Sequence, residues 1–202
     1  MSNSSTQAKL AILFADISGS TALYDKLGDT IALGIVTKCL DIMVAELAPR
    51  AGVLIKTIGD EILCTFPSPA AALEAACAMQ MAIDQESPGG DRPIYIRIGF
   101  HYGEVLLKDN DAFGDAVNIA ARLTSVTRAK QIITSQTVID LLPSAYAEKV
   151  RPVMRAAFKG KHDSFPLFQI LWAHENTVFN RIGEARSRKK STVLPQPQPA
   201  GI

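Results

Sequence analysis

Several features that would place a protein in a specialised class are missing from this sequence. Its 202 residues include only three cysteines, Cys39, Cys64 and Cys77, which are odd in number and unevenly spaced. That spacing matches neither a zinc site nor a redox pair, and it excludes a disulfide scaffold. The formal net charge is +1, so no broad positive field attracts nucleic acid or acidic lipid. We therefore expect reduced core cysteines in a cytoplasmic protein that has no nucleic-acid partner.

The sequence also has no hydrophobic run long enough to cross a bilayer. Residues 1–9 are polar and lack the apolar segment of a signal peptide, so we expect no membrane contact in this chain. What the sequence does have is an apolar content of 48%, enough for one sizeable core. We expect one domain over 7–172, a disordered N-terminus over 1–6, and a linker or mobile tail over 173–202. The Pro-Gln-rich end of that tail suggests a further domain beyond Ile202.

Hydrophobic periodicity and turn residues predict an α+β fold. The apolar run at 10–15 suits a strand buried on both faces, and Gly59 and Asp60 between two apolar segments predict a hairpin. Ser68 and Pro69 are typical of a helix start. The predicted strands are 10–15, 53–58, 61–66, 94–100, 104–107, 131–134, 151–158 and 166–171, and the predicted helices are 29–47, 68–83, 115–126 and 138–142. The order β-α-β-β-α-β is that of a ferredoxin-like split βαβ core, here extended by further strands and helices.

Two aspartates stand where this core would bring strand ends together. Asp16 ends the first predicted strand, and Asp60 lies at the tip of the hairpin. Taken singly, each is explained as a cap or turn residue, because aspartate is common at both places. In a split βαβ sheet, however, the first strand ends beside the central hairpin, so the two carboxylates would converge and repel. A pair of Mg²⁺ or Mn²⁺ ions would relieve the repulsion and bind triphosphate oxygens as well.

The loop after Asp16 is a weaker candidate for phosphate binding. It contains Gly19, Ser20 and Thr21 at the predicted start of a helix, where backbone N–H groups can hold an anion. Such residues usually serve only to cap the helix. The loop is not a P-loop, because the chain has no G-x-x-x-x-G-K-[ST] motif.

A lysine and an aspartate could read a purine base together. Lys56 lies inside an apolar strand, on the predicted face of Leu54 and Ile58, and Asp111 follows a polar loop. The plain alternatives are that Lys56 extends to the sheet edge and that Asp111 is simply solvated. As a pair, Lys56 can donate to N1 of adenine while Asp111 accepts from the N6 amine. Guanine reverses both groups, so the pair favours ATP over GTP.

The predicted helix 115–126 carries two further polar candidates. Asn118 and Arg122 are four residues apart and share a face, which in most helices is simply solvated. The functional alternative is that Asn118 orients a ribose while Arg122 meets the charge that develops on an α-phosphate. Lys159, in the basic turn 158–161 before the last strand, could reach the β- and γ-phosphates.

These motifs resemble those of class III adenylate/guanylate cyclase catalytic domains. The resemblance rests on 14–17 (FADI), 56–60 (KTIGD), 97–103 (RIGFHYG) and 111–122 (DAFGDAVNIAAR), and it extends over about 7–172. It implies an adenylate cyclase, which forms cyclic AMP and pyrophosphate from ATP at the interface of an antiparallel, head-to-tail homodimer. The matching residues are Asp16, Asp60 and Ile17 for metal, Lys56 and Asp111 for adenine, Asn118 and Arg122 for the transition state, and Lys159 for the triphosphate.

Three alternatives differ in substrate or in activity. A diguanylate cyclase would carry Gly-Gly-Asp/Glu-Glu-Phe at the hairpin, whereas residues 58–62 are IGDEI. A guanylate cyclase of the same class is nearer, but Lys56 and Asp111 argue against it. A catalytically silent dimerisation module would be expected to have lost some of the charged residues, and this chain keeps all of them.

Overall fold

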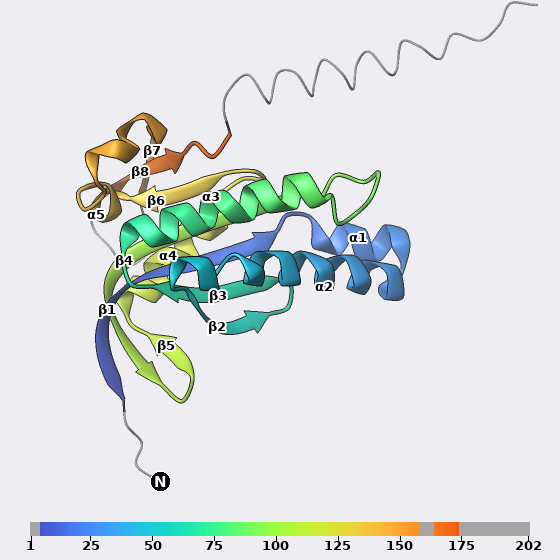
Figure 1. Ribbon diagram of the computed structural model, residues 1–202, viewed down its shortest axis with the longest axis horizontal. Coiled ribbons are helices and arrows are strands. Elements are labelled where there is room, and N and C mark those ends of the chain that lie inside the picture. The colour runs from blue at the N-terminus through green and yellow to red at the C-terminus, as the bar shows by residue number, and fades with distance from the viewer. Residues whose placement is uncertain (1–4, 158–163, 174–202) are drawn as a thin grey trace, which may run out of the picture. The chain divides into compact units, whose positions relative to one another are not determined.

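The computed structural model describes residues 5–157 and 164–173, which form one mixed sheet with helices on both faces (Figure 1). The strands are β1 Thr6–Ile17, β2 Val53–Ile58, β3 Glu61–Phe66, β4 Ile96–Lys108, β5 Asp111–Phe113, β6 Ile132–Ser135, β7 Val150–Ala157 and β8 Ser164–Ile170. The helices are α1 Ser20–Leu27, α2 Asp29–Ala45, α3 Pro69–Glu86, α4 Asp115–Val126 and α5 Gln136–Ile139, with short 3₁₀ turns η1 Ala48–Arg50 and η2 Ser144–Lys149.

The strand order confirms the predicted split βαβ core. The path through the sheet is β2-β3-β1-β4-β6-β8-β7, and β5 pairs with β4 outside that path. Within β2-β3-β1-β4 each neighbouring pair is antiparallel, so β3 lies between the parallel strands β1 and β2. The added strand β6 runs parallel to β4, and β8 and β7 complete the sheet beyond it.

Strand β1 is buried on both faces, as its continuous apolar run predicts. Leu13, Ala15 and Ile17 pack in one cluster with residues of α2 and α3, which cross the near face of the sheet in Figure 1. Ile12 and Phe14 pack on the other face with Ala116 and Ala120 of α4. Because successive side chains of a strand alternate between faces, Asp16 shares the α4 side of the sheet with Ile12 and Phe14.

Helix α3 begins as the sequence predicts, and α2 matches the predicted helix 29–47 except for its last two residues, but α1 was not predicted as a helix of its own. Ser68 caps α3 by accepting a hydrogen bond from the N–H of Ala71 at 3.2 Å, and Pro69 follows it. The structure has a further helix, α1, before α2, and the two are joined at Gly28, whose φ is 75°. Glycine adopts this backbone conformation without steric cost, so Gly28 is the sequence signal for the break.

The predicted break in the fourth strand is wrong. Strand β4 is continuous over Ile96–Lys108, because it pairs with β1 along the whole length from Ile17 to Thr6. It then turns back through Asp109 and Asn110, both with positive φ, into β5, a strand that is absent from the sequence prediction. Asn and Asp tolerate that conformation in two-residue hairpins. This hairpin brings Asp111 onto the sheet.

Gly99 of β4 marks a close approach of α4 to the sheet. A Cβ at Gly99 would lie 2.3 Å from the backbone nitrogen of Thr124. We expect Gly99→Ala to lower the free energy of unfolding by about 1–3 kcal/mol, because α4 must move away from the sheet. Urea denaturation measures this change. The control is Gly34→Ala in α2, where a Cβ meets nothing within 4 Å, so this variant should be as stable as the parent or more so.

The cysteines are free and buried, as expected for core residues. Burial raises the pKa of the Cys39 and Cys77 thiols to about 11, so both stay protonated at neutral pH. Among the described residues, no helix combines the length and hydrophobicity that a membrane crossing requires. The described residues up to Trp172 belong to one compact unit. The predicted limits of the N-terminal segment and the tail remain predictions.

Candidate active site

Asp16 and Asp60 come together at one rim of the sheet. Asp16 lies one residue before the end of β1, opposite Glu61 in the β1–β3 ladder, and Asp60 occupies the β2–β3 turn after Gly59. Burial raises the pKa of the Asp16 carboxyl, the guanidinium of Arg97 lowers it, and the negative charge of Asp60 raises it further. The two carboxylates therefore lie within electrostatic reach of each other, which the metal prediction requires.

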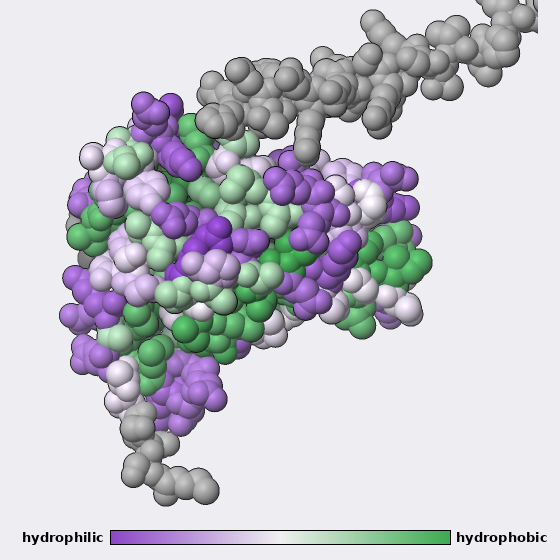
Figure 2. All heavy atoms as spheres, in the orientation of Figure 1, coloured by the Kyte–Doolittle hydropathy of each residue, from purple (hydrophilic) through white to green (hydrophobic). Residues whose placement is uncertain are grey.

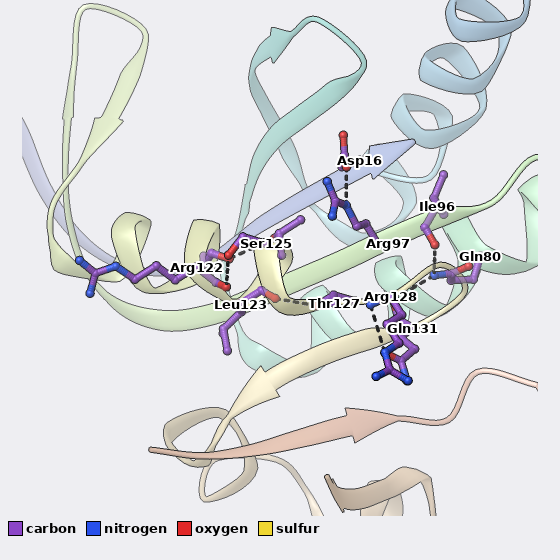
Figure 3. A network of polar contacts seen from close by, with 12 residues as sticks. Asp16, Gln80, Ile96, Arg97, Arg122, Leu123, Ser125, Thr127, Arg128 and Gln131 are labelled. Atoms are coloured by element: carbon purple, nitrogen blue, oxygen red, sulfur yellow. Dashed lines mark hydrogen bonds and ion pairs between the residues drawn. The ribbon is translucent and has the colours of Figure 1, made fainter. Parts of the chain in front are cut away.

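Two residues that sequence reasoning missed complete this rim. Arg97 of β4 lies opposite Asp16 in the β1–β4 ladder, and its Nε donates to Asp16 Oδ2 at 2.5 Å (Figure 3). Glu61 lies on the other side of Asp16, and burial and the charge of Asp16 raise its pKa to about 7. Three acidic groups and one guanidinium thus share one end of β1, β3 and β4. The spacing along the chain gave no signal, because only the strand register brings Arg97 to Asp16.

The rim has the donor chemistry for Mg²⁺ or Mn²⁺. Both ions prefer oxygen ligands, and the side chains at the rim supply carboxylates. The side chain of Ile17 is 2% exposed within the core, so only its main-chain carbonyl could act as a ligand. Within 5–157 and 164–173, no group of three or more acidic, histidine or cysteine side chains is placed so that it could hold a metal ion. The metal role of Asp16 and Asp60 stays a prediction.

The loop that follows β1 offers polar groups beside the rim. Gly19 has φ 78° and precedes α1, with no side chain capping the helix. The first N–H groups of a helix have no partner within the helix and can hold an anion. Ser18 Oγ is buried and has no hydrogen-bond partner among the residues described. The predicted phosphate role of Gly19, Ser20 and Thr21 stays a prediction.

Lys56 and Asp111 meet although 55 residues separate them. Lys56 Nζ lies 2.5 Å from Asp111 Oδ2, and the two side chains are 41% and 27% exposed. Asp111 Oδ1 also accepts from the N–H of Ala112 at 2.8 Å, and the hydrogen bond from Lys56 lowers the pKa of Asp111. Lys56 therefore does not simply extend into solvent. The pair stands at the junction of β2 and the β4–β5 hairpin.

A bulge in β2 corrects the predicted orientation of Lys56. Leu54 pairs with Cys64 and Lys56 pairs with Leu63, so the register shifts between the two residues of β2. Cys64 belongs to the core under α2 and α3, whereas Leu63 faces α4. Lys56 therefore lies on the α4 side of the sheet and not on the face of Leu54. A bulge cannot be read from alternation, because it shifts that alternation by one residue.

Asn118 and Arg122 lie one turn apart on α4, but they do not join Asp16. Asn118 is exposed and Arg122 is partly exposed, while Ala116, Ala120 and Leu123 of the same helix are buried. In Figure 3 the side chain of Arg122 points away from the Asp16–Arg97 pair. Within one chain, the Arg122 side chain and the acidic rim thus lie apart. Lys159 lies outside the described residues.

Solved structures similar to this fold are nucleotidyl cyclase domains, and this is the class to which the fold and the rim point. An adenylate/guanylate cyclase/hydrolase from Silicibacter pomeroyi is 27% identical with a TM-score of 0.74, over 83% of this chain and 99% of that one. The catalytic core of a rhodopsin-guanylyl cyclase with converted specificity, solved with ATPαS, has a TM-score of 0.75 at 21% identity, over 83% of this chain and 97% of that one. At that identity the second likeness concerns the fold alone.

Comparison of sequences gives the family. The model of the adenylate and guanylate cyclase catalytic domain matches residues 3–170, so this chain belongs to that family. An adenylate cyclase from Streptomyces coelicolor is 32% identical over 145 residues, which are 70% of this chain and 34% of that protein. An adenylate cyclase from Streptomyces griseus is 34% identical over 57% of this chain and 28% of that protein. The chain therefore spans about a third of these relatives or less.

Proposed function

We propose that this protein is an adenylate cyclase, which converts ATP into 3′,5′-cyclic AMP and pyrophosphate. Family membership and the adenylate cyclases among its relatives support a cyclase, and the ion pair between Lys56 and Asp111 carries the choice of ATP. The pair holds a donor and an acceptor side by side, in the arrangement that the N1 acceptor and N6 donor of adenine require. Its two side chains are partly exposed, so both can be reached by a base.

The cost of mispairing explains why GTP would be rejected. Guanine presents an N1–H to the ammonium of Lys56 and its O6 to the carboxylate of Asp111. Each mispaired polar group costs about 1–3 kcal/mol. For two groups, this amounts to roughly thirtyfold to ten-thousandfold discrimination, at about 1.4 kcal/mol per factor of ten.

The remaining residues would position the reacting groups. Asp16, Asp60 and the carbonyl of Ile17 would hold two Mg²⁺ or Mn²⁺ ions, which when bound lower the pKa of the ribose 3′-OH and neutralise phosphate charge. Asn118 orients the ribose, and Arg122 stabilises the charge that develops on the α-phosphate. The loop with Gly19, Ser20 and Thr21 would bind phosphate oxygens through N–H and hydroxyl groups, and Lys159 would bind the far end of the triphosphate. The 3′ oxygen attacks in line, and pyrophosphate leaves.

The separation of the acidic rim from Arg122 supports a site shared by two chains. In a head-to-tail homodimer, the rim of one chain faces Lys56, Asp111, Asn118 and Arg122 of the other. Apolar surface is available for such contact. Figure 2 shows apolar surface around β2, and the exposed apolar side chains of β2 and of the β4–β5 hairpin include Val53, Leu54, Ile58, Leu106 and Phe113. A symmetric dimer would hold two complete sites.

A guanylate cyclase of the same class is the second candidate. The observation in its favour is that the family includes both activities, and one structural neighbour is a guanylyl cyclase whose specificity was converted. The choice between the two nucleotides depends on few residues in the proposed site, which makes it directly testable.

We expect the protein to form cyclic AMP from ATP with Mn²⁺ and to use GTP at least about thirtyfold less well by kcat/KM. Lys56→Glu combined with Asp111→Lys should reduce this preference, because it exchanges the charges that meet the base edge. Product analysis by chromatography measures both rates across a protein dilution series. Comparable turnover of GTP by the parent would overturn the assignment of ATP as the substrate. If neither nucleotide gave product, the chain would be a catalytically silent module.

A further inference from the structure

The predicted metal ligand Asp16 already has a cationic partner within its own chain. Arg97 Nε lies 2.5 Å from Asp16 Oδ2, and the Asp16 side chain is only 11% exposed. Hydrogen bonds between two charged groups are among the stronger polar contacts in proteins. The guanidinium therefore occupies one oxygen of the carboxylate that the proposed function gives to a metal ion.

A metal ion and a guanidinium compete for that carboxylate. Both are cations, and within one partly buried site their mutual repulsion is only weakly screened. An ion bound to Asp16 would weaken the contact between Arg97 and Oδ2 and would favour transfer of the guanidinium to another anion. Glu61, which stands directly opposite Asp16 in the β1–β3 ladder, offers a second carboxylate on the same rim that is not a predicted metal ligand. The charge of Arg97 lowers the pKa of Glu61 against the larger effect of burial, so Arg97 and Glu61 already interact.

We propose that Arg97 is a displaceable counter-ion of the metal site, held on Asp16 without metal and transferred to Glu61 when an ion binds. This inference rests on the proposed function, because it takes Asp16 as a metal ligand. In this arrangement Arg97 weakens the binding of free metal ions. Glu61 then acts as a positioning residue, since it offers the displaced guanidinium a second carboxylate.

The test measures Mn²⁺ binding to the nucleotide-free full chain by electron paramagnetic resonance at pH 8. We expect Arg97→Gln to bind Mn²⁺ about tenfold more tightly than the parent, because a hydrogen bond between charged groups no longer competes. Arg50→Gln is the matched control, because it removes the same guanidinium from an arginine paired with Glu46 instead of Asp16, at the other end of β2 from the β2–β3 turn. This control should change Mn²⁺ affinity less than about threefold, as a distant charge in a screened medium does.

A double-mutant cycle separates transfer to Glu61 from a general effect of its charge. Glu61→Gln should weaken Mn²⁺ binding in the parent but have at most a small effect in Arg97→Gln, where no guanidinium needs a new partner. An equal loss in both backgrounds would show that Glu61 acts only through its charge and would overturn the transfer. If Arg97→Gln and the parent bind Mn²⁺ with the same affinity, or if neither binds it measurably, the claim that Arg97 competes with metal for Asp16 is wrong.

A direct readout follows the Arg97 side chain itself. In a ¹H–¹⁵N spectrum, the Nε–H resonance of Arg97, assigned with Arg97→Gln, should move during a Mg²⁺ titration, and Asp16→Asn should abolish the movement. An Arg97 resonance that stays in place at saturating Mg²⁺ would refute the inference. Cyclic AMP formation is measured separately. If the protein forms cyclic AMP but Arg97→Gln leaves metal affinity unchanged, this inference alone is refuted. If Arg97→Gln changes metal affinity but the parent protein forms no cyclic AMP, the proposed function alone is refuted.

Discussion

An equal mixture of Asp16→Asn and Arg122→Ala chains is expected to recover about a quarter of the parent rate, although each variant alone is inactive. The reason is the separation of the acidic rim from Arg122 in one chain. In a mixed head-to-tail dimer, the intact rim of the Arg122→Ala chain faces the intact Arg122 of the Asp16→Asn chain. Half of the dimers in a random mixture are mixed, and each contains one complete site of two. The measurement is cyclic AMP formation after subunit exchange.

The control for this experiment is a mixture of Asp16→Asn with Asp60→Ala. Both changes affect the same half of the site, so every site in a mixed dimer lacks one carboxylate, and no activity should return. Recovery in this control would contradict the shared site. A failure of the first mixture, with mixed dimers demonstrated by mass spectrometry, would show that each chain holds its own complete site.

The second large effect is expected for Asp60→Ala, which should lower cyclic AMP formation by at least about a thousandfold. The loss follows because one of the two carboxylates that would hold the ions is gone. Asp60 lies in a hairpin turn and is partly exposed, so its removal should leave the thermal denaturation midpoint within a few degrees of the parent.

Asp25→Ala is the matched control, because Asp25 is an exposed aspartate of α1 that is not among the proposed site residues. It should keep both the parent rate and the parent stability. If Asp60→Ala retained the parent rate with Mg²⁺ or Mn²⁺, the metal role of Asp60 would be wrong. If it unfolded, Asp60→Asn, which keeps the shape of the side chain, would take its place in the assay.

Much of the fold could be predicted from the sequence, because local patterns determine it. The apolar run before Asp16 identified a strand buried on both faces, and Ser68 with Pro69 identified the start of α3. Helix α4 and both strands of the β2–β3 hairpin have the predicted limits. Helix α1 between Gly19 and Gly28, the continuity of β4 and the existence of β5 were missed. Each depends on a positive φ or on pairing with a distant strand, and not on hydrophobic periodicity.

The sequence by itself determined which chemical groups are available: two aspartates at strand ends, a lysine in an apolar strand, and an amide and a guanidinium on one helix face. Only the tertiary structure decided how these groups meet. The register of β1 and β4 brings Arg97 into contact with Asp16. The bulge in β2, together with the β4–β5 hairpin, brings Lys56 into contact with Asp111. The physical reason is that side-chain chemistry is a local property. Contacts between residues 55 or 81 positions apart are fixed by backbone pairing across the whole sheet.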